Sequence, residues 1–199
     1  MRSLSTFCDI QLGYNARTRI ESADDGDTPF LQMRDVSANG RVNSDSLERA
    51  HLANIGERYV ANAGDIVFRS RGIPNIAAVV DAGQAQPVVV SPLVILRPNR
   101  KIVVPEYLVW YIGQAAAQRH FDEGAQGATM KMISKRSIET LPVPIPDLRT
   151  QSAIVELHAL ANEEGRLLTL LADKRRALVN SVLLDQARKT QPHGNGAGH

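Results

Sequence analysis

The chain has 199 residues, of which 43% are hydrophobic and 5% aromatic. This composition supports one packed core and argues against a largely disordered chain. A net charge of +2 excludes binding to nucleic acid by bulk charge alone, and the single cysteine, Cys8, excludes an internal disulfide. Because no run reaches the roughly 18 apolar residues of a membrane span, and the N-terminus lacks a signal-like stretch, we expect a cytoplasmic protein without membrane contact.

Residues 1–146 are predicted to form a β-rich domain, which gives the chain an α+β fold class. Short runs enriched in β-branched residues are bounded by Gly, Pro, Ser and Asn, a pattern typical of strands. These runs cover residues 28–35, 65–70, 76–80, 88–90 and 94–96. Apolar residues at spacings of three and four predict an amphipathic helix over residues 105–122, and a short helix is expected over residues 134–141.

The segments after this domain differ from it in composition. Residues 141–146 place three prolines between apolar residues, which predicts an extended connector packed against the domain. Residues 147–189 contain no proline and one glycine, and they predict a single long helix. Residues 190–199 are rich in Gly, His and Asn and predict a disordered tail.

The predicted long helix carries an apolar stripe with heptad spacing. Its members, at positions a and d, are Ile154, Leu157, Ala161, Leu168, Leu171, Leu178 and Val182. At 1.5 Å per residue such a helix is roughly 60 Å long, which exceeds the width of the preceding domain. We therefore expect part of the stripe to pack against another helix in a coiled coil, as in a homodimer. A helix folded back at Gly165 is the alternative.

Two groups of residues are candidates for contact with double-stranded DNA. The first consists of Arg69, Ser70 and Arg71, which follow an apolar strand; on a strand, the two arginines share one face. Arginine is the commonest specific partner of guanine in the major groove. The alternative is a solvated strand end with surface ion pairs.

The second group lies in a polar loop that continues into a basic run. Glycines in this loop let backbone N–H groups approach a phosphate closely. The group comprises Gln126, Gly127, Thr129, Lys131, Lys135 and Arg136. An ordinary loop between helices is the alternative. A further basic cluster, Arg97, Arg100 and Lys101, is interpreted as the tip of a hairpin.

The sequence shows no motif for catalysis. It lacks the Asp/Asn-Pro-Pro-aromatic loop of adenine methyltransferases, a phosphate-binding P-loop, and histidines at metal-ligand spacing. We therefore predict no catalytic residue, no metal and no cofactor. Two other classes stay open: a nuclease whose site the sequence does not reveal, and a coiled-coil assembly module that does not read DNA.

Four motifs, taken in order, make the chain resemble the specificity subunit of type I restriction–modification enzymes, in a form with one target-recognition domain. They are residues 29–36, the Gly-Asp-Ile segment in 63–72, the Gly-rich segment 124–131, and the junction 141–154. The junction keeps the family's prolines and Gln151, but it has Thr150 where the family usually has Glu. The resemblance covers roughly residues 1–185.

The resemblance implies a non-catalytic subunit that reads DNA. A separate adenine methyltransferase would be directed to a bipartite DNA site, together with a motor–nuclease subunit where the system cleaves DNA. In the family the two recognition domains are related by a pseudo-twofold axis, which implies antiparallel helices. A chain with one domain is then expected to form a homodimer.

Overall fold

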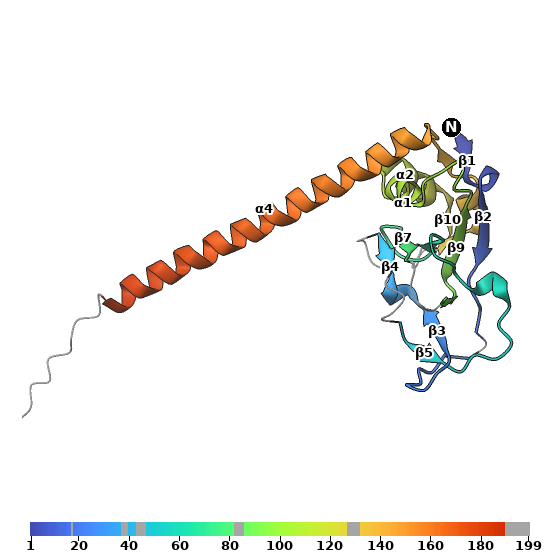
Figure 1. Ribbon diagram of the computed structural model, residues 1–199, viewed down its shortest axis with the longest axis horizontal. Coiled ribbons are helices and arrows are strands. Elements are labelled where there is room, and N and C mark those ends of the chain that lie inside the picture. Colours follow the sequence, from blue (N-terminus) through green and yellow to red (C-terminus); the bar gives the residue numbers. More distant parts are fainter. Residues whose placement is uncertain (17, 37–39, 43–46, 82–85, 127–131, 190–199) are drawn as a thin grey trace, which may run out of the picture. The chain divides into compact units, whose positions relative to one another are not determined.

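The largest sheet among the described residues has five strands. The computed structural model describes residues 1–16, 18–36, 40–42, 47–81, 86–126 and 132–189. The strand order is β2 (Cys8–Leu12), β9 (Leu93–Pro98), β6 (Ile66–Arg69), β7 (Ala77–Val80) and β4 (Arg41–Val42). Figure 1 labels β2, β9, β7 and β4 among them. Neighbouring strands are antiparallel except for β7 and β4, which are parallel.

Smaller sheets flank this one. One consists of β5 (Arg49–Ala50), β3 (Thr28–Leu31) and β8 (Val88–Val89). Two more are the pairs β1 (Arg2–Ser3) with β12 (Pro142–Val143), and β10 (Ala125–Gln126) with β11 (Met132–Ile133). Short 3-10 turns cover Leu4–Thr6, Met33–Asp35 and Glu57–Tyr59. The predicted α+β class, a β-rich domain followed by a long helix, is confirmed.

The central strand β6 is buried on both faces, so its apolar residues run without a break. Phe68 faces the layer of helices and packs on Phe121 with ring centroids 5.1 Å apart. Val67 points to the opposite face and joins a second cluster with Leu31. The helices are α1 (Pro105–Ile112), α2 (Ala115–Gly124) and α3 (Lys135–Glu139).

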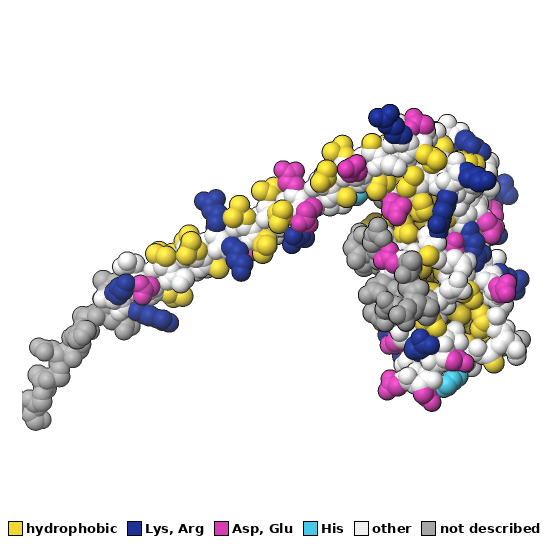
Figure 2. Space-filling model, viewed as in Figure 1, with side chains coloured by type: hydrophobic (Ala, Val, Ile, Leu, Met, Phe, Trp, Pro, Cys, Tyr) yellow, Lys and Arg dark blue, Asp and Glu magenta, His cyan; other side chains and the backbone are white. Residues whose placement is uncertain are grey.

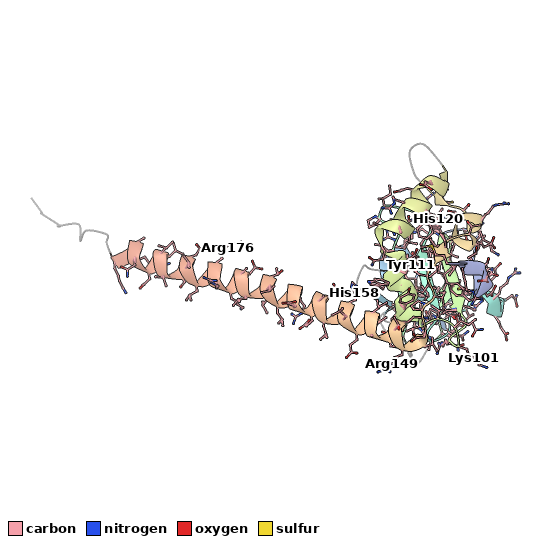
Figure 3. The ribbon with its side chains drawn as sticks, turned by 90° about the horizontal axis from the view of Figure 1, so that it is seen from above. Lys101, Tyr111, His120, Arg149, His158 and Arg176 are labelled. Atoms are coloured by element: carbon pink, nitrogen blue, oxygen red, sulfur yellow. The ribbon has the colours of Figure 1, made fainter. Side chains whose placement is uncertain are left out.

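The single helix predicted over residues 105–122 is wrong, because the chain forms two helices there. Helix α1 ends before Gly113, and Gln114 has an extended backbone with ψ of 150°. The two pieces pack their own apolar faces on the sheet, so their combined spacing resembles one amphipathic helix. Figure 3 labels Tyr111 on α1 and His120 on α2.

The proline connector is held by tyrosines of α1. The hydroxyl of Tyr107 donates to the carbonyl of Pro144, and that of Tyr111 to the carbonyl of Pro142, both at 2.8 Å. Burial raises the pKa of both hydroxyls, so they stay protonated as donors. The connector therefore packs on the domain as an ordered strip.

Arg97 stabilises the fold through hydrogen bonds to a buried carboxylate and to backbone carbonyls. Its Nε atom donates to the buried carboxylate of Asp65 at 3.3 Å, and Nη2 donates to the carbonyls of Arg58 and Val60. Asp65 also accepts the amide of Asn62. Burial raises the pKa of Asp65, and Arg97 opposes that shift by its charge. The Asp of the Gly-Asp-Ile motif is thus explained by this network.

The first turns of α4 (Leu148–Lys189) belong to the domain. Asp147 caps the helix: Oδ1 accepts the amide of Thr150 at 2.8 Å, and Oδ2 accepts its hydroxyl at 3.0 Å. These bonds hold the pKa of Asp147 below its usual range. Thr150 therefore completes the cap in the position where a glutamate was expected.

Gln151 is fully buried beneath this first turn. Its Oε1 accepts the amide of Val104 at 2.8 Å, and its Nε2 donates to the carbonyls of Ile102 and Pro146. The side chains of Ile154 and Val155 then pack on the core. Residues 1–155 accordingly form one compact unit, and residues 156–199 form the other.

Helix α4 continues through Gly165, so a helix folded back at that residue is wrong. Large apolar side chains line it and are exposed, among them Leu157 at 69% and Leu178 at 65%. Figure 2 shows hydrophobic side chains along the helix, interspersed with charged ones. None of the described helices has the length and apolar composition needed to cross a membrane.

Replacing Gln151 by Leu should destabilise the domain by about 1–3 kcal/mol, because the amide of Val104 and the carbonyl of Ile102 would lose their buried partner. Urea denaturation followed by circular dichroism measures the change. Ser152→Ala, at the exposed neighbouring position, is the control and should leave the midpoint nearly unchanged. An unchanged midpoint for Gln151→Leu would contradict this role.

Candidate nucleic-acid interface

The end of β6 adjoins the hairpin of β10 and β11. Arg71 forms a bridge with Met132, and the amide of Ile133 donates to the carbonyl of Ser70 at 2.8 Å. Gln126 closes the other side of the hairpin, opposite Met132. The structure therefore brings together the two segments that the sequence singled out separately. Gly127, Thr129 and Lys131 lie outside the described residues.

Ser70, which lies between the two arginines in the sequence, has a structural role. Its side chain is buried, and its hydroxyl donates to the carbonyl of Pro92. A serine in this arrangement fixes the strand end against the neighbouring turn. This bond uses the one proton of the hydroxyl, so Ser70 could contact a ligand only as a hydrogen-bond acceptor without losing it.

Arg69 and Arg71 have unused hydrogen-bonding capacity. The Nε atoms of both are buried, and neither has a hydrogen-bond partner among the described residues. The guanidinium of Arg69 extends towards Gly72, where an added Cβ would lie 3.8 Å from Nη2. A guanidinium held this way can donate to a planar acceptor pair such as guanine O6 and N7, or to phosphate oxygens.

A buried asparagine fixes the turn that follows these arginines. The Nδ2 of Asn75 donates to the carbonyls of Arg69 and Gly72. Gln118 of α2 accepts the amide of Asn75 at 3.0 Å and donates to its carbonyl at 2.9 Å. Gly72 has a φ of +99°, which favours glycine. No sequence pattern indicates the role of Gln118, because its partner Asn75 is far away in the chain.

Lys135 and Arg136 follow the same hairpin at the start of α3. Ser134 caps this short helix by accepting the amide of Ser137. Lys135 lies 3.6 Å from Glu139 in an exposed pair, and Arg136 is exposed. Two cations in the first turn do not favour the helix dipole, so helix stability does not explain them. They extend the positive charge next to β11.

Other reactive groups in the described ranges are accounted for by the fold. Cys8 is buried, and burial raises the pKa of its thiol to about 12, so it stays a thiol at neutral pH. His120 lies 2.9 Å from the carbonyl of Ser137. No group of three or more His, Cys, Asp or Glu side chains within the described ranges could hold a metal ion.

The family model for the type I restriction modification DNA specificity domain matches residues 1–168. The chain belongs to this family. Membership confirms the predicted resemblance to the type I restriction–modification specificity family.

Solved structures share the fold. A chain from a study of complex assembly and conformational transition of the type I R-M system is 19% identical, with a TM-score of 0.66 over 90% of this chain and 42% of that one. The HsdS subunit from Thermoanaerobacter tengcongensis is 18% identical, with a TM-score of 0.59 over 81% of this chain and 36% of that one.

A third relative, the type I S subunit from M. genitalium, is 15% identical, with a TM-score of 0.53 over 90% of this chain and 43% of that one. The present chain therefore spans less than half the length of these solved chains. A search of curated proteins found no match.

Replacing Gln118 by Ala should loosen the turn beside the arginines, because the amide and carbonyl of Asn75 would lose their partner. The expected cost is about 1–3 kcal/mol in unfolding free energy. Faster hydrogen exchange at the Asn75 amide is the specific readout. Arg119→Ala, at the exposed next position of α2, is the control; equal exchange rates in both variants would refute the bracing role.

Proposed function

We propose that this chain is a specificity subunit with one target-recognition domain, which directs a separate adenine methyltransferase to a bipartite DNA site. The observation that carries the proposal is the strand end of Arg69 and Arg71 joined to the β10–β11 hairpin, in a member of the DNA specificity family. The system would work in the cytoplasm, in defence against phage, with a motor–nuclease subunit where it cleaves DNA.

Within the domain, the arginines are proposed to read base edges. Both arginines are half-buried at the strand end, beside the β10–β11 hairpin, so part of each side chain stays accessible to a ligand. Gln126, Gly127, Thr129 and Lys131 are proposed to contact the same DNA segment, because they belong to or follow β10. Lys135 and Arg136 are proposed to contact phosphates, which carry affinity without sequence information.

The exposed stripe of α4 is proposed to pair with a second copy of the chain. Its heptad members Leu157, Leu168, Leu171, Leu178 and Val182 are each more than half exposed. An antiparallel pair of identical helices gives a true twofold axis, so each domain would read the same half-site in opposite orientation. Leucines off this seam, among them Leu160 and Leu183, are proposed as the docking surface of the methyltransferase.

Methylome sequencing of cells that express the chain with its methyltransferase tests DNA reading. We expect a palindromic bipartite motif. In binding assays on that motif, Arg69→Ala should cost about 1–3 kcal/mol and relax specificity at one symmetric pair of positions. Lys135→Ala is the comparison: it should weaken binding to all sequences alike and flatten the salt dependence. A continuous, non-palindromic motif would reject the symmetric dimer.

Leu168→Asp should convert the dimer to a monomer, because it places a carboxylate in the apolar seam. Light scattering at tens of micromolar measures the mass. Thr169→Asp adds the same charge one residue further along the helix, away from the seam, and should leave the dimer intact. A monomeric wild-type chain at this concentration would contradict the pairing of the helices.

A further inference from the structure

Exposed apolar side chains border the arginine pair. In the described part of residues 1–147, the exposed large hydrophobic side chains are Met1, Leu12, Ile73 and Met132. Two of these four flank Arg71: Met132 forms the bridge with it, and Ile73 follows two residues later. Ile73 is 69% exposed, the largest exposed fraction of the four after that of Met1.

The fold keeps Ile73 in this position. The turn between β6 and β7 is fixed on both sides of it, because Asn75 donates to the carbonyls of Arg69 and Gly72 and is itself bonded to Gln118. Ile73 could therefore reach the core only if the backbone of this turn changed its conformation. A side chain on a fixed turn loses little freedom on binding, so a contact made there adds efficiently to affinity.

The surroundings of Ile73 identify the partner as a polyanion with an apolar group. The half-buried cations Arg69 and Arg71 lie at the same strand end, and the basic residues of α3 follow the adjoining hairpin. DNA meets this requirement, because the C5-methyl group of thymine is the apolar group that its major groove displays. An apolar protein surface would leave those guanidinium groups without acceptors.

We propose that Ile73 is a specificity-determining residue that packs on the C5-methyl group of a thymine in the target site. The proposal rests on the DNA-reading function above and deepens it. Arginine beside isoleucine on one rigid turn would read a guanine and a neighbouring A·T pair together. Burying one methyl group contributes about fourfold in affinity, from roughly 0.8 kcal/mol per CH2-sized group.

The test uses the full chain in complex with the methyltransferase of its own system. A binding site is selected from a random duplex pool, and each thymine of the selected site is then replaced in turn by uracil, which removes only the methyl group. We expect one thymine, or one symmetric pair, at which uracil weakens binding about fourfold. For Ile73→Ala, the thymine and uracil duplexes should bind equally, and both as weakly as the wild-type complex binds uracil or weaker.

Two variants act as controls. Ile73→Val keeps a branched apolar side chain and should retain most of the discrimination. Leu148→Ala removes an exposed apolar side chain in the first turn of α4 and should discriminate like the wild type. All three variants should melt like the wild type, because their side chains are exposed, so a loss of discrimination reports the contact and not unfolding.

The outcomes separate this proposal from the proposed function. Equal binding of all uracil duplexes by the wild-type complex, or a selected site without any A·T pair, would overturn the role of Ile73 while leaving DNA reading intact. So would retained discrimination in Ile73→Ala. A pool that yields no enriched sequence would overturn DNA reading itself, and this proposal with it.

Discussion

The pairing of β11 with the end of β6 is the contact on which the candidate interface depends. One hydrogen bond, from the amide of Ile133 to the carbonyl of Ser70, and the bridge between Arg71 and Met132 join segments that are far apart in the sequence. Without this pairing the arginines and the hairpin would be two unrelated polar surfaces. With it, basic, amide and apolar side chains come from adjacent backbone segments whose positions the sheet determines.

Amide side chains hold two further connecting segments in place. Asn75 and Gln118 hold the turn after β6, and Gln151 holds the first turn of α4 against the domain. In each case an amide satisfies backbone groups that regular secondary structure leaves unpaired, so the position of a connecting segment becomes part of the core. Polar contacts thus hold the segments next to the candidate interface in place.

The two compact units differ in how they treat apolar surface. In the described part of residues 1–155, apolar side chains are enclosed in clusters on both faces of the five-stranded sheet. In the described part of residues 156–199, leucines and valines of α4 are exposed in an order that follows heptads. The first pattern belongs to a domain that folds around its own core, and the second to a surface that another chain would cover.

The α+β class, the strands around β6, β7 and β9, and the uninterrupted helix from Leu148 could be predicted from the sequence, because these rest on local periodicity and on proline and glycine positions. Its motifs also indicated the family. It did not separate α1 from α2, since both helices bury the same kind of face. Strands of two residues, such as β1, β10 and β12, have no periodicity to detect.

The polar residues that stabilise the fold could be recognised only in the three-dimensional structure. Arg97 and Arg69 look alike in sequence, each lying at the end of a β-prone run. In the structure Arg97 is bound by the carboxylate of Asp65 and backbone carbonyls, whereas the Nε of Arg69 has no partner among the described residues. The physical reason is that hydrogen-bond partners come from distant segments, and no local pattern records them.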